Sequence, residues 1–199
     1  GVLCVPATSA QEAAEKLIRW NAVAGVVALL FGGILALLVT ATRWQAIHLL
    51  PAEGWLARSV AIRRDHELFH YFTYRRYGRI RTHVFDELLA DFAGLVGADG
   101  RYRAHLALRF LGLDRFPEIR QDGRMLNYVR EKLPMEAWPV VAALAVRAAA
   151  SLEAIAEAHR DRLTTSAGMH DVLLALCPLA LDELASEAAP GFVASRLRL

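Results

Sequence analysis

The spacing of hydrophobic and polar positions along this 199-residue chain is predominantly helical. Over residues 82–97 and again over 138–163, apolar side chains recur at intervals of three and four positions, which is the period of a helix with one buried face. Alternation typical of strands is confined to two short runs, residues 60–62 and 80–84. The pattern therefore predicts an all-α fold, a compact domain built from several helices.

Shorter helical segments are expected around these two long ones. They cover residues 58–77, 101–111, 125–133, 171–176 and 179–188. Residues that commonly end helices follow four of them, namely Gly78, Gly112, Pro134 and the pair Pro190-Gly191. Residues 45–57 are interpreted as a connector because Pro51 and Gly54 interrupt them.

An apolar stretch without any charged residue, residues 22–42, precedes these helices. Arg19-Trp20 and Arg43-Trp44 flank it, and its length, uncharged centre and flanking residues are typical of a membrane span. The alternative is a buried helix, or a tight helical pair broken at Gly32-Gly33. The chain is therefore divided into an N-terminal helical segment, residues 1–44, and a helical domain, residues 45–199.

Charge and cysteine content narrow the choice of partner and compartment. A formal net charge of +2 gives no global basic field, so no nucleic-acid partner is expected. Positive charge is concentrated locally, at Arg63, Arg64, Arg75, Arg76, Arg79 and Arg81. These arginines either form a solvated rim or attract an acidic substrate or lipid headgroups. Two cysteines are too few for a disulfide framework, which fits a reducing compartment. We expect a cytoplasmic or inner-membrane-associated protein, with residues 45–199 on the cytoplasmic side if the apolar stretch spans a membrane.

The clearest chemical signal is the motif His66-Glu67-x-x-His70 within the segment expected to be helical. Two histidines four positions apart lie one above the other on a helix, so both imidazoles can reach one metal ion. Glu87 and Asp91 follow on the next helical segment, again four positions apart. They can supply a third ligand and a carboxylate behind a ligand histidine. Residues 45–199 are therefore predicted to be a metal-binding domain, with zinc as the expected ion.

This order of motifs, His-Glu-x-x-His and then Glu-x-x-x-Asp, resembles the gluzincin branch of the zinc metallopeptidases over residues 65–91. The resemblance implies that His66, His70 and Glu87 hold zinc. It further implies that Glu67 is the catalytic general base and that Asp91 hydrogen-bonds a ligand histidine. The activity expected on this basis is hydrolysis of a peptide or protein substrate.

The residues alone leave the third ligand open. His83, Glu87 and Asp91 are spaced i, i+4 and i+8 and share one stripe of a helix. His83 is therefore the third ligand, a donor to the transition state, or simply an exposed residue. Other donor candidates are Tyr71, Tyr74 and Tyr128. Asp65 and Asp86 lie off the stripe and are expected to be solubilising residues or to support a ligand.

Two other functions compete with hydrolysis. Glu67-x-x-His70 is also half of a di-iron carboxylate site in a helical bundle, although the sequence contains no second Glu-x-x-His. The helix pair could equally form a structural metal site in a non-catalytic, membrane-associated or scaffold protein, in which a closed four-ligand site is expected. His170-Asp171 is a pair found in metal phosphohydrolases, but it is interpreted as a helix cap because further ligands are missing.

Overall fold

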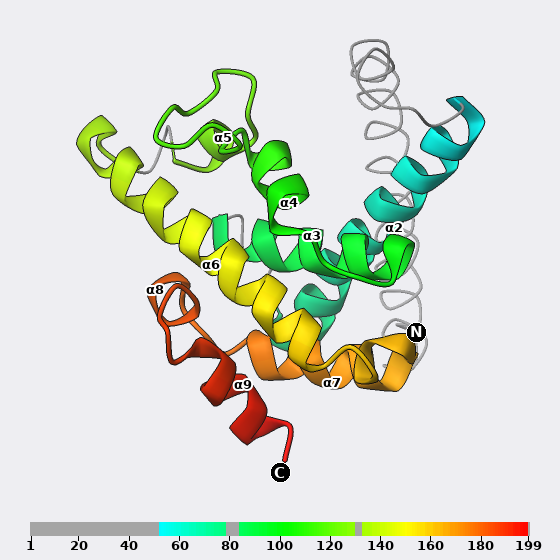
Figure 1. Ribbon diagram of the computed structural model, residues 1–199. Coiled ribbons are helices and arrows are strands. Elements are labelled where there is room, and N and C mark those ends of the chain that lie inside the picture. The colour runs from blue at the N-terminus through cyan, green and yellow to red at the C-terminus, as the bar shows by residue number, and fades with distance from the viewer. Residues whose placement is uncertain (1–51, 79–83, 130–132, 199) are drawn as a thin grey trace, which may run out of the picture. The chain divides into compact units, whose positions relative to one another are not determined.

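The computed structural model of the protein describes residues 52–78, 84–129 and 133–198, and over these ranges the fold is all-α, as predicted. The elements are α2 (Ala52–Tyr77), α3 (Val84–Asp99), α4 (Ala104–Leu111), α5 (Met125–Val129), η1 (Met135–Ala137), α6 (Trp138–Ala158), η2 (Arg162–Thr164), α7 (Ser166–Leu176), α8 (Leu181–Leu184) and α9 (Ala189–Arg196) (Figure 1). Within the described ranges there is no strand, only an isolated bridge between Arg115 and Glu118. Residues 22–42 and His83 lie outside the described residues, so the expectations for them stay predictions.

The core of the unit formed by residues 57–199 is organised around α6. The buried face of this helix consists mostly of alanine, with Leu152 and Ile155 as its large members. Alanine lets neighbouring backbones approach closely, and α6 packs against α3 and α4 as well as against α8 and α9. Figure 1 shows α6 as the long helix between these two pairs.

One segment in the described ranges, Met135–Ala158, is long and apolar enough to cross a membrane when judged by length and composition. It consists of η1 and α6. The central helix of a helical core has the same composition, and the alanine face of α6 is buried against its neighbours. The sequence of this segment alone therefore does not assign it to a membrane.

Part of the connector predicted over residues 45–57 is helical, because residues 52–57 belong to α2. Gly54 lies inside this helix. A single glycine in a helix costs only about 1 kcal/mol relative to alanine, so its presence is a weak reason to end a helix there.

Two predictions about helix ends are wrong. α7 begins at Ser166, and the side chain of Thr165 caps it by accepting a hydrogen bond from the Gly168 N–H at 3.1 Å. The pair His170-Asp171 therefore lies inside α7 and is not its cap. Pro190 lies in the first turn of α9 and does not close the preceding helix. Proline suits that position because a first-turn N–H would have no partner within the helix.

Candidate metal centre

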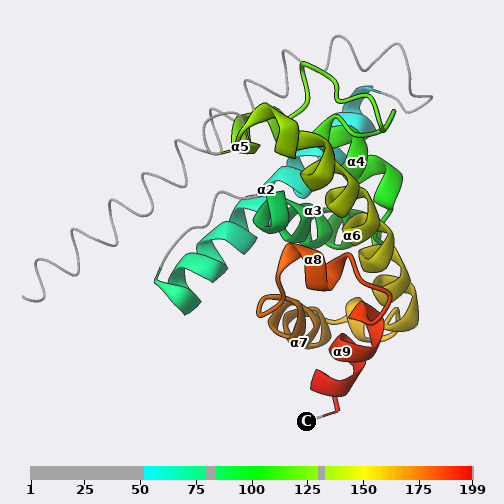
Figure 2. The same cartoon turned by 90° about the vertical axis from the view of Figure 1, so that its left-hand side faces the viewer.

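Two glycines of α3 allow this helix to approach α2 closely, and Figure 2 shows the two helices side by side. A Cβ atom on Gly94 would lie 2.5 Å from a backbone oxygen of α2, and a Cβ on Gly97 would collide with the carboxylate of Asp65. Glu87, Asp91 and Gly94 are spaced i, i+4 and i+7, so they lie on the same face of α3. The face that contacts α2 therefore also carries the acidic residues.

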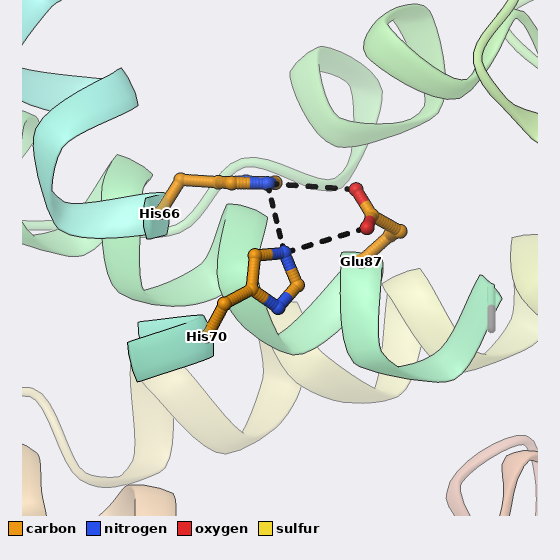
Figure 3. Close-up of side chains that lie close together, drawn as sticks. All are labelled: His66, His70 and Glu87. Carbon is orange, nitrogen blue, oxygen red and sulfur yellow. Dashed lines mark hydrogen bonds and ion pairs between the residues drawn. The ribbon is translucent and has the colours of Figure 1, made fainter. Parts of the chain in front are cut away.

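This close contact brings the two histidines of α2 against Glu87 of α3 (Figure 3). The Nε2 atoms of His66 and His70 are 3.2 Å apart. Each faces a different oxygen of the Glu87 carboxylate, with 3.5 Å from His66 Nε2 to Oε2 and 3.4 Å from His70 Nε2 to Oε1. His66 and Glu87 are buried, and the His70 side chain is 13% exposed. The three side chains thus point toward one another from two helices, with one ligand atom of each within 4.8 Å of the others.

The spacing and the donor set suit a zinc ion. Zinc–ligand distances of about 2.0–2.1 Å in a tetrahedral site separate neighbouring ligand atoms by roughly 3.3 Å. The histidine–histidine and histidine–carboxylate distances lie close to that value. Two imidazoles and one carboxylate are a common set of ligands for zinc, and three protein ligands leave a fourth position for water or substrate.

Asp91 lies behind His66 and orients its ring. In the tautomer with the proton on Nδ1, His66 donates to Asp91 Oδ1 at 2.9 Å, and Nε2 then carries the lone pair that a metal ion requires. The other carboxylate oxygen, Oδ2, accepts a hydrogen bond from Arg124 Nη2 at 2.5 Å. The buried Nδ1 atom of His70 has no hydrogen-bond partner among the described residues. A carboxylate therefore orients one of the two histidines.

Arg124 is a residue of this centre that the sequence motifs do not reveal. It directly precedes α5 and also approaches the second acidic residue, with 3.4 Å from its Nη1 to Glu87 Oε2. It lies 33 residues after Asp91, beyond α4 and a loop. No fixed spacing on one helix links it to the histidines, so it could only be found once the helices were assembled.

The electrostatics of the metal-free centre keep both carboxylates ionised. Burial opposes ionisation of Glu87, but hydrogen bonds from His66 and His70 and the charge of Arg124 outweigh burial and hold the pKa of Glu87 well below its usual range. The pKa of Asp91 is likewise lowered against the effect of burial, by the charge of Arg124 and by His66. Burial opposes protonation of His66, yet hydrogen bonds to Asp91 and Glu87 leave its pKa raised. A metal ion that binds His66 must therefore compete with a proton that this residue holds more tightly than a free histidine does.

Glu67, the expected general base, follows His66 on α2 but does not belong to the cluster of ligand atoms. Its side chain is 9% exposed. It forms an ion pair with Arg63 one turn earlier, with 2.5 Å from Arg63 Nη2 to Glu67 Oε1. This contact fixes the Glu67 carboxylate against the preceding turn of α2.

The three tyrosines named as donors occupy different surroundings. Tyr128 on α5 lies beside Glu87, and burial together with that carboxylate raises the pKa of its hydroxyl. Tyr71 and Tyr74 on α2 are exposed, at 38% and 45%. Tyr128 is therefore the tyrosine of these three that is closely associated with a ligand residue.

The structure excludes a solubilising role for Asp86, which is 1% exposed. Neighbouring elements cover α3 on all sides, so that every residue from Val84 to Val96 is buried. Asp65 lies against Gly97, and its carboxylate accepts hydrogen bonds from Arg64 at 2.7 and 3.1 Å. Asp65 thus lies where α2 and α3 meet, and Asp86 is buried inside the fold.

Comparison with known proteins gives one family. A model described as a family of unknown function (DUF7005) matches residues 39–188. The chain belongs to this family. The matched range contains α2 through α8 and therefore every residue of the candidate metal centre. Searches of curated proteins and of solved structures find no match.

Proposed function

We propose that this member of the DUF7005 family is a zinc-dependent hydrolase, most specifically a metallopeptidase. The observation that carries the proposal is the convergence of His66, His70 and Glu87 at zinc-like spacing. The hydrogen bond between Asp91 and the Nδ1 atom of His66 also supports the proposal, because a histidine that binds a metal usually donates its other ring N–H to a carboxylate or carbonyl. Three protein ligands leave a fourth position for water, which suits hydrolysis better than the four ligands of a closed structural site.

In the proposed reaction, zinc would supply a Lewis acid that polarises the substrate carbonyl and makes water a better nucleophile. Glu67 accepts the proton from the attacking water, the role implied by its place between the two histidines of the motif. Asp91, the other carboxylate of the centre that is not a ligand, is already hydrogen-bonded through both of its oxygens. Tyr128 is the donor we favour for the developing oxyanion, because its hydroxyl lies beside Glu87. His66 keeps its direction through Asp91 during the reaction.

The substrate we propose is a peptide or protein. The described residues contain no strand, so an extended peptide could not be held by pairing with a sheet edge there. Side chains and helix ends around the centre would have to bind it. We further propose that the domain acts in the cytoplasm or on the cytoplasmic face of the inner membrane, on the basis of the arginines that follow the apolar stretch 22–42.

Metal content and peptide cleavage, measured on the same preparations, test this proposal. His66→Ala and Glu87→Ala should each lose zinc, with a larger fall in affinity than the roughly 10- to 100-fold expected for loss of a supporting residue. Glu67→Gln should keep zinc and lose cleavage of a mixture of unstructured peptides followed by mass spectrometry, because only the proton acceptor is removed. His105→Ala, which changes an exposed histidine of α4, is the matched control and should behave like the wild type.

Two results would contradict the proposal. Zinc retained by both ligand variants would mean that the ion binds elsewhere. Cleavage that survives Glu67→Gln unchanged would mean that the centre is structural and that the activity belongs to a contaminant or to another site.

A further inference from the structure

Arg124 contacts both acidic residues of the metal centre at once. Its Nη2 donates to Asp91 Oδ2 at 2.5 Å, and its Nη1 lies 3.4 Å from Glu87 Oε2. A guanidinium carries its donors in one rigid plane, so two carboxylates bound to it are held in a fixed relative orientation. Because Asp91 in turn holds His66, the arginine is linked to two of the three ligand residues.

The side chain of Arg124 is itself anchored on the side away from the metal centre. Its Nε donates to the backbone oxygen of Phe110 at 3.4 Å, and its guanidinium carbon lies 5.7 Å from the centre of the Phe110 ring. The loop that precedes it is held against the end of α4, since a Cβ atom on Gly112 would lie 2.5 Å from the Cα atom of Gly123. The side chain is 25% exposed and is therefore mostly enclosed by these contacts. Arg124 thus connects α4 and α5 to the ligands.

Charge and geometry predict opposite effects of this arginine on metal binding. The guanidinium repels a divalent ion at close range, so on charge alone its removal should strengthen metal binding. As an orienting group it holds Glu87 Oε2 and Asp91 Oδ2 in place, so on geometry its removal should weaken metal binding. The direction in which metal affinity changes when Arg124 is replaced therefore shows whether the arginine acts through its charge or by orienting the ligands.

We propose that Arg124 is a positioning residue of the metal centre. By contacting Oε2 it fixes the orientation of the Glu87 carboxylate, whose two oxygens face His66 and His70. Through Asp91 it fixes the direction of His66 Nε2. This inference rests on the metal site of the proposed function but not on its hydrolytic activity.

The test is metal binding by the full chain, freed of metal and then titrated with Co²⁺ and Zn²⁺ against a chelator of known affinity. Arg124→Met should bind both ions about 10- to 100-fold more weakly, which is the usual effect of losing a supporting residue. Arg124→Lys keeps the charge but has no rigid fork, so it should also bind more weakly and should shift the d–d absorption bands of bound Co²⁺. Arg120→Met is the matched control, because Arg120 lies in the same loop and pairs with Asp114 and Asp122.

Circular dichroism and thermal unfolding, recorded on the same samples, separate loss of orientation from loss of the fold. If Arg124→Met does not fold, Arg124→Lys decides the question alone. Unchanged or tighter binding by folded Arg124 variants overturns the proposal, since the arginine would then only compensate two buried carboxylates. A wild type that binds no metal overturns this proposal and the proposed function together, whereas one that binds metal without cleaving peptides contradicts only the hydrolase.

Discussion

Two of the helix contacts that α3 makes, one with α6 and one with α2, are built from opposite kinds of residue. The buried residues of α6 are all apolar, namely Ala142, Ala145, Ala148, Ala149, Leu152, Ile155 and Ala156. The six polar or charged side chains that are buried in the described part of the chain all lie on α2 or α3, namely His66, Glu67, Thr73, Asp86, Glu87 and Asp91. One face of α3 therefore belongs to a hydrophobic core and the other to a polar cluster.

This difference separates the apolar contacts, which stabilise the fold, from the polar contact, which carries the candidate metal ligands. Burial of apolar surface contributes about 25 cal/mol for each Å², whereas a buried charge costs free energy unless it is paired. The pairs His66–Asp91, Arg124–Asp91 and Arg63–Glu67 offset that cost but do not exceed what a well-packed apolar contact would provide. Under the proposed function, the polar contact between α2 and α3 serves the metal site, whereas the apolar contacts of α6 stabilise the fold.

The largest expected effect on stability comes from a substitution in the apolar core around α6. Leu152→Ala removes a side chain that is fully buried in the core and leaves a cavity. It should lower the free energy of unfolding by about 2–5 kcal/mol, as measured by urea denaturation. The folded fraction should bind zinc with wild-type affinity, because the metal centre lies on the other face of α3. A parallel loss of zinc affinity would show that the two faces are not independent.

The next effect concerns the glycines at the contact between α2 and α3. Gly94→Ala puts a Cβ atom 2.5 Å from a backbone oxygen of Ile62, and backbone cannot move without shifting α2. Overpacking of this kind costs about 1–3 kcal/mol. Because the shift separates the histidines from Glu87, zinc affinity should fall as well, even in protein that remains folded.

Gly97→Ala is the matched control for that change. Its added Cβ meets the carboxylate end of Asp65, a flexible side chain that can rotate away. Both stability and zinc affinity should change less than in Gly94→Ala, when measured by denaturation and by chelator competition. Equal losses of zinc affinity in the two variants would mean that the spacing of the helices does not set the geometry of the centre.

The sequence predicts the helices and the residues that each helix carries better than it predicts the contacts between helices. The 3.6-residue period of apolar positions predicts both helices of the site and the all-α class, because a helix with one buried face repeats apolar residues at that period along its own sequence. His66, His70, Glu87 and Asp91 can be named from i, i+4 spacing on single helices. Arg124 and Gly94 cannot, since each acts through a contact with another element. Asp86 is misjudged for the same reason, because a second layer of helices covers the side of α3 on which it lies.

The smallest expected effect is the pH dependence of stability, to which His66 in the metal centre and His159 at the end of α6 contribute with opposite sign. In the metal-free protein the raised pKa of His66 stabilises the fold below about pH 6.5, and this contribution is lost as pH rises through the folded-state value. His159, at the end of α6, has its pKa lowered by burial and by Arg162, so it destabilises the fold at acid pH, and this penalty is removed as pH rises toward about 6.5, just below the window of His66. The lowered pKa values of Glu87 and Asp91 act only at acid pH, where their contributions are lost.

Urea denaturation between pH 5 and 8, with and without zinc, resolves these two histidines. In a chelator, His159→Gln should remove the rise in unfolding free energy below about pH 6.5 and leave the fall above that pH, which belongs to His66, unchanged. Each unit of difference between folded and unfolded pKa values corresponds to about 1.4 kcal/mol. With zinc the dependence should reverse, since the ion requires neutral imidazoles and competes better with protons as pH rises. A slope that keeps the same sign in zinc and in chelator would contradict binding of the ion through His66.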